Sequence, residues 1–83
     1  MACINPDGTL SEVAKRVLTR LANPHSAAAI AKAAGLPLFR VRATIRETGR
    51  AALIAEVGQD PDGQAVWRLT DLGFEALEID AGD

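Results

Sequence analysis

Apolar residues recur at spacings of three and four near the start of the chain, which is the period of a helix with one buried face. The stretch Thr9-Leu10-Ser11-Glu12 matches the capping box, in which a threonine hydroxyl and a glutamate carboxylate each satisfy an unpaired backbone N–H. Asn23-Pro24 ends the pattern, because proline disfavours helical backbone in the residue before it. The sequence therefore predicts a first helix over about residues 9–22. Its inward stripe consists of Leu10, Val13, Ala14, Val17, Leu18 and Leu21.

A second, shorter helix is predicted over residues 27–34, which consist mainly of alanine. Ser26 is a favourable N-cap for it, and Gly35 can take the left-handed conformation that closes it. Pro37 then fits the first turn of a third helix. An alanine-rich helix has little side-chain bulk, so it suits a place where two other helices approach closely.

The third helix, predicted over about residues 37–49, has a basic outer face. Val41 and Ile45 supply its inward row, and Thr48 stands where a third apolar residue is expected. At about 100° per residue, the positions opposite Val41 hold mainly arginine and small or flat apolar side chains. Arginine can grip phosphate or guanine with two hydrogen bonds, and small apolar groups can meet thymine methyls. These outer and flanking positions are Phe39, Arg42, Ala43, Arg46 and Arg50.

A β-hairpin and a last helix complete the pattern. Residues 53–57 and 65–69 have strand character, and the segment between them is dense in glycine, aspartate and proline. Thr70 follows as an N-cap, with Asp71 placed favourably in the first turn of a helix. We expect Phe74, Leu77 and Ile79 to face inward on this helix. Residues 80–83 read as a frayed tail.

Charge is distributed unevenly along the 83 residues, although the net charge is only −2. Residues 15–50 carry eight basic side chains and one acid, whereas residues 51–83 carry eight acids and Arg68 as their one base. Such asymmetry points to a polyanionic partner. The plainer alternatives are two solvated surfaces of opposite sign, or an arginine helix that serves solubility alone.

Several classes of protein are disfavoured by the composition. Cys3 and His25 are the one cysteine and the one histidine, so a zinc site or a disulfide is not expected. Ser26 beside His25 is better explained as a helix cap than as a nucleophile, and we expect neither an enzyme nor a cofactor. Neither a signal peptide nor an apolar run as long as a membrane span is evident, so we expect a cytoplasmic protein.

The order of these elements resembles the winged helix-turn-helix domain of bacterial regulators of the MarR and ArsR kind. The resemblance covers about residues 9–78 and rests on short motifs in a fixed order. These are Gly35-Leu36, then Val41 and Ile45, then Ala52-Leu53-Ile54, and finally Leu69-Thr70-Asp71-Leu72-Gly73. It implies one mainly helical α+β domain over residues 1–83: a three-helix helix-turn-helix core, a two-stranded hairpin wing and a short C-terminal helix.

The resemblance also implies binding to double-stranded DNA, with the third helix in the major groove. The residues it carries over as base-facing candidates are Leu38, Phe39, Arg42, Ala43 and Arg46. The phosphate candidates are Lys32, Arg40 and Arg50. A homodimer is a further partner to consider, because dimers of such folds read two half-sites on DNA.

The sequence departs from this pattern in three respects. Asp60 and Asp62 occupy the tip of the wing, where a DNA-binding wing usually offers lysine or arginine. Thr48 and Ala52 replace an expected apolar residue and an expected glycine. The regulators compared are also longer, and we expect neither a sensor domain nor a long dimer arm here. A protein-interaction module without DNA binding is therefore the alternative, in which the acidic hairpin meets a basic helix of another molecule.

Overall fold

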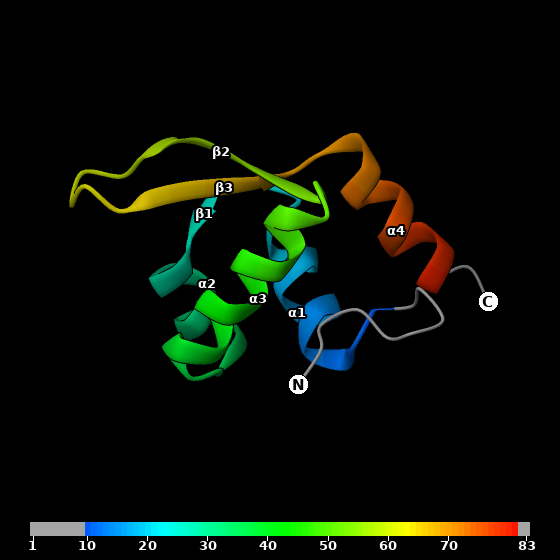
Figure 1. Cartoon of the computed structure of the whole chain (residues 1–83). Helices are drawn as coiled ribbons and strands as arrows, with labels where there is room; N and C mark the ends of the chain where they lie inside the picture. The colour runs from blue at the N-terminus through cyan, green and yellow to red at the C-terminus, as the bar shows by residue number, and fades with distance from the viewer. Residues whose placement is uncertain (1–9, 82–83) are drawn as a thin grey trace.

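The computed structural model of the protein describes residues 10–81. Three helices lie beneath a small antiparallel sheet, the hairpin extends beyond them on one side, and a fourth helix lies on the other side (Figure 1). In chain order the elements are α1 (Glu12–Arg20), β1 (His25–Ser26), α2 (Ala27–Ala34), α3 (Leu38–Arg50), β2 (Ile54–Gln59), β3 (Ala65–Leu69) and α4 (Asp71–Ala81). The expected order of helices and hairpin is confirmed.

The start of α1 differs from the prediction. The backbone N–H of Ala14 donates to the hydroxyl of Ser11 at 3.1 Å, so Ser11 is the N-cap and the helix begins at Glu12. Thr9 lies outside the described residues. Leu10 is buried and lies in a single β-bridge, which holds it in non-helical backbone. The cap therefore lies two positions after the predicted one.

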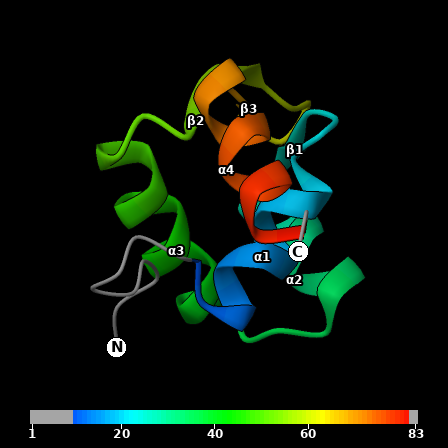
Figure 2. The ribbon, with the colours of Figure 1, turned by 90° about the vertical axis from the view of Figure 1, so that its right-hand side faces the viewer.

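The core lies where α1, α2 and α3 contact one another and meet the base of the hairpin. In the view of Figure 2, α3 is seen on one side of α1 and α2 on the other, with α4 in front; α2 and α3 also contact each other directly. The predicted inward stripes are confirmed for α1 and α3. The buried apolar cluster consists of Leu10, Ala14, Val17, Leu18, Leu21, Ile30, Val41, Ile45, Leu53, Ile54 and Leu69.

The sheet has three strands in the order β1-β3-β2, so the expected hairpin gains a strand that the sequence did not indicate. In this added pair, His25 lies opposite Trp67 and Ser26 lies opposite Val66. The backbone N–H of Leu69 also donates to the carbonyl of Leu21 at 2.8 Å. These bonds fasten the hairpin to the end of α1.

Two small residues shape the joint between α3, the hairpin and α4. Ala52 has φ +62°, in the left-handed region where the resemblance leads one to expect glycine. The hydroxyl of Thr70 donates to the carbonyl of Ala52 at 2.6 Å and accepts the N–H of Gly73 at 3.1 Å. The predicted N-cap at Thr70 is therefore confirmed. Gly73 lies so close to the backbone of Leu53 that a Cβ there would be 2.1 Å from the Leu53 carbonyl oxygen.

Helix α4 packs with a different face from the one predicted. The face that turns to the core carries Gly73, Ala76 and Leu77, whereas Phe74 is 41% exposed. The inward placement of Phe74 is thus wrong, because close approach at Gly73 fixes the rotation of the helix. The helix continues to Ala81, so residues 80 and 81 are not a tail; the side chain of Ile79 lies outside the description.

Candidate nucleic-acid interface

A short turn connects α2 to α3, and its backbone hydrogen bonds join residues that are close in the sequence. Gly35, with φ +66°, ends α2 as predicted, and its N–H donates to the carbonyl of Ala31. The N–H of Leu36 donates to the same carbonyl at 3.0 Å. Pro37 then acts as the N-cap of α3, and its carbonyl accepts the N–H of Val41 at 3.2 Å. This short connection sets the direction in which α3 leaves α2.

The inner face of α3 is secured by two buried threonines as well as by apolar side chains. Thr44 and Thr48 are 1% and 0% exposed. The Thr48 hydroxyl donates to the carbonyl of Thr44 at 2.7 Å, and the Thr44 hydroxyl donates to the carbonyl of Arg40 at 3.0 Å. Because both hydroxyls are satisfied within the helix, Thr48 can occupy the position where an apolar residue was expected.

The outer face of α3 carries the predicted side chains, and all of them are exposed. Going around the helix, they fill a sector of about 100°, which leaves a continuous basic and apolar stripe along it. The acid of this helix, Glu47, is half-buried and borders the stripe, one turn from Ala43 and from Arg50. The exposed residues of the stripe are Phe39, Arg42, Ala43, Arg46 and Arg50.

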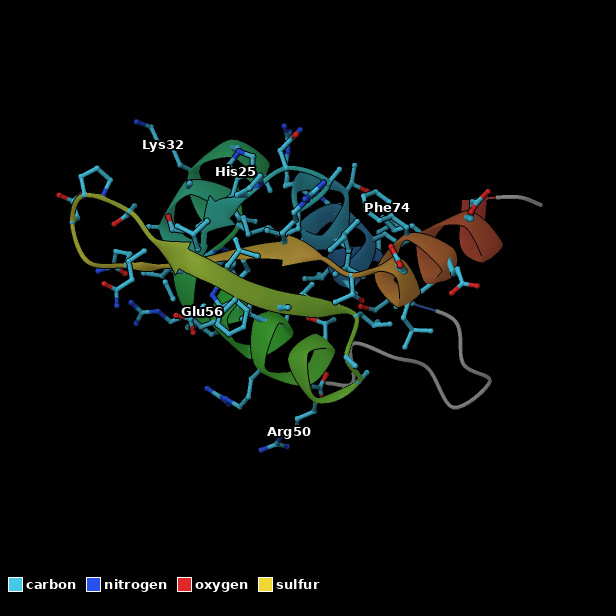
Figure 3. The ribbon with its side chains drawn as sticks, turned by 90° about the horizontal axis from the view of Figure 1, so that it is seen from above. His25, Lys32, Arg50, Glu56 and Phe74 are labelled. Carbon is cyan, nitrogen blue, oxygen red and sulfur yellow. The ribbon has the colours of Figure 1, made fainter. Side chains whose placement is uncertain are left out.

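The other predicted DNA-binding residues lie outside this stripe. Leu38 is half-buried at the start of α3. Arg40 is half-buried as well, and it lies about 160° around the helix from Arg42. Lys32 is exposed on α2, but Lys32 and Arg50 lie at opposite sides of the molecule when it is seen from above (Figure 3). The structure therefore groups most base-facing candidates and spreads the three phosphate candidates apart.

The hairpin beside α3 has an acidic tip held by side-chain hydrogen bonds. One carboxylate oxygen of Asp60 accepts the backbone N–H groups of Asp62 and Gln64, each at 2.9 Å. Asp60 is thereby a structural residue of the turn, whereas Asp62 is exposed. A β-bulge between Glu56 and Gly58 leaves Val57 without a partner on β3 and 54% exposed. The carboxylate of Asp60 therefore holds the turn, and the carboxylate of Asp62 places negative charge on its surface.

Two basic residues of α1 have a role that the sequence analysis missed. The guanidinium of Arg16 donates to the carbonyl of Ala34, and that of Arg20 donates to the carbonyl of Ala33 at 3.4 Å. These carbonyls end α2 and have no partner within the helix. Lys15 lines the same open hollow of about 380 Å³. Two of the eight basic residues in the 15–50 segment therefore hold α1 and α2 together. The order of charges along the sequence does not reveal this role.

Membrane and metal sites receive no support from the described part of the chain. None of its helices combines the length and apolar character needed to cross a bilayer. Within residues 10–81, histidine, cysteine and carboxylate side chains do not gather in the groups of three that a metal ion would need. The exposed arginine stripe on α3 is the candidate site that remains.

Several solved structures with the same arrangement of elements are transcriptional regulators from bacteria. The PcaV regulator of Streptomyces coelicolor superposes with a TM-score of 0.76 at 21% identity, over 92% of this chain and 55% of that one. The adhesin competence repressor AdcR of Streptococcus pyogenes also reaches 0.76, at 17% identity, over 88% and 56% of the two chains. The chain has the winged helix fold.

A third neighbour adds a nucleic-acid complex. ZitR of Lactococcus lactis, described as a zinc-responsive MarR family member, has been solved with DNA, and that structure matches at a TM-score of 0.74 and 19% identity over 99% of this chain. The present winged helix chain spans a little over half the length of these regulators, 55–57% of the three chains. Neither a protein-family model nor a curated protein matches the sequence.

Proposed function

We propose that this protein binds double-stranded DNA with the outer face of α3 in the major groove and acts as a transcriptional regulator. The observation that carries the proposal is the stripe of three exposed arginines on the helix that follows the turn of a winged helix fold. The ZitR complex supports it, since that neighbour with the same fold was solved with DNA.

The dimensions of α3 suit this role. From Leu38 to Arg50 the helix is about 18 Å long, while the major groove is about 12 Å wide. A helix that enters the groove with its first turns leaves its last turn near a phosphate backbone. Arg42 and Arg46 are then the residues placed to contact base edges, and Arg50 is placed to contact phosphate. Lys32 lies on another element and would meet the backbone elsewhere.

The acidic wing limits the affinity. Asp62 and Glu56 are exposed on the hairpin, and a phosphate backbone would repel them. The acidic hairpin in this proposal therefore opposes binding, and α3 supplies most of the binding energy. With about two phosphate contacts, from Arg50 and Lys32, the logarithm of the binding constant should fall with the logarithm of salt concentration at a slope of about −2.

The test is binding of fluorescent genomic duplex fragments at low salt by the wild type and by Arg42→Ala and Arg46→Ala. Each lost base contact should cost about 1–3 kcal/mol. Arg68→Ala is the matched control: Arg68 is also exposed, but it alternates along β3 with Trp67 and Leu69, which pack on the core, so it points away from the helices. Absence of any complex, or equal effects of all three substitutions, would refute the proposal.

The acidic hairpin favours one second candidate, a protein-interaction module. Exposed Glu56 and Asp62 on one molecule are complementary in charge to the arginine stripe on another. This candidate predicts a dimer that dissociates as salt is added and that does not bind duplex DNA. Analytical ultracentrifugation at low and high salt, beside the duplex titration, separates the two.

A further inference from the structure

The most exposed large apolar side chain in the described part of the molecule lies within the arginine stripe. Phe39 is 73% exposed, in the first turn of α3. Ala43 is one turn further along and is also exposed, so the two form a short apolar strip on the helix surface. Arg42 and Arg46 lie beside this strip. A phenylalanine in such a position contributes little to the core of its own domain.

The edge of a base pair in the major groove offers hydrogen-bonding atoms and, at thymine alone among the four bases, a methyl group. An apolar strip at the start of a recognition helix has no other apolar group to meet there. We infer that Phe39 and Ala43 select thymine in the bound sequence by contacting its methyl group, while Arg42 and Arg46 select guanine nearby. This inference rests on the proposed function and adds the chemistry by which the site chooses a sequence.

Deoxyuridine provides the probe, because it pairs and hydrogen-bonds as thymidine does and lacks only the methyl group. Duplexes that bind the wild type are first selected from a random-sequence library, and their thymidines are then replaced by deoxyuridine one at a time. Transferring one methyl-sized group out of water changes an equilibrium by about fourfold. The wild type should therefore bind about fourfold more weakly when a contacted thymidine is replaced, and equally well at other positions.

Variants show which side chains make the contact. The ratio of the affinity for the thymidine duplex to that for the deoxyuridine duplex should be about four for the wild type. Phe39→Ala should reduce this ratio towards one. Because the Phe39 ring is exposed, the fold does not depend on it. Arg42→Ala should weaken binding to both duplexes and leave the ratio near four. Far-UV circular dichroism confirms that both variants are folded.

The outcomes separate the two proposals. If duplexes bind but replacement has no effect at any thymidine, thymine selection through this strip is overturned and DNA binding stands. If the loss of affinity on replacement is the same in Phe39→Ala as in the wild type, thymine selection by the Phe39 ring is overturned and DNA binding stands. If the library yields no bound duplex, both proposals fail together. A ratio near four that disappears with Phe39→Ala supports both.

Discussion

The joint at Gly73 gives the sharpest test of the structure. A Cβ at this position would lie 2.1 Å from the carbonyl oxygen of Leu53 and 2.7 Å from Cδ2 of Leu69. The same carbonyl accepts the N–H of Thr70 at 3.0 Å, so it cannot move away without losing a hydrogen bond. Gly73→Ala must therefore push α4 away from the turn that connects α3 to the hairpin.

The magnitude follows from three opposing contributions. Overpacking typically costs about 1–3 kcal/mol, and contact with backbone places this case at the upper end. The weakened hydrogen bond costs about 1 kcal/mol more, and the higher helix propensity of alanine returns about the same amount. We expect a loss of about 3 kcal/mol in the free energy of unfolding, which lowers Tm by about 12–24 °C in a domain of this size.

Gly49→Ala is the matched control, because Gly49 is also helical but a Cβ there would meet no heavy atom within 4 Å. It should stabilise the protein by about 0.5–1 kcal/mol, since alanine restricts the unfolded chain. Thermal and urea unfolding followed by circular dichroism measure both variants. If Gly73→Ala is as stable as Gly49→Ala, the described approach of α4 to Leu53 is wrong.

Two further predictions concern the neighbouring joint and the wing. Ala52→Gly should stabilise the protein by about 0.5–1 kcal/mol, because a backbone φ of +62° is costly for alanine and readily adopted by glycine. Thermal unfolding tests this prediction. The control is Ala51→Gly, which should destabilise the protein because Ala51 has an ordinary φ of −82°. Asp62→Lys should raise affinity for duplex DNA severalfold at low salt and little at high salt, without loss of Tm, because Asp60 and not Asp62 supplies the carboxylate that holds the turn. Unchanged affinity at low salt would mean that the tip lies far from the phosphates.

The sequence by itself determined the features that depend on neighbouring residues. Ser26 caps α2 and Gly35 closes it because each acts on backbone groups within a few positions. The inward and outward faces of α3 follow from helical periodicity, so the exposed arginines could be named in advance. The capping hydroxyl of Thr70 and the turn residues of the hairpin are local signals of the same kind.

Only the tertiary structure decided the features that depend on distant partners. A strand of two residues at His25 has no periodicity of its own and exists because Trp67 lies opposite it. The rotation of α4, which leaves Phe74 exposed, is set by the approach of Gly73 to Leu53. The sequence indicates no role for Arg16, which bonds to the end of α2 because α1 packs beside it. Local backbone chemistry thus fixed the helices and the faces of α1 and α3, while packing between separate elements fixed the face of α4 and the added strand.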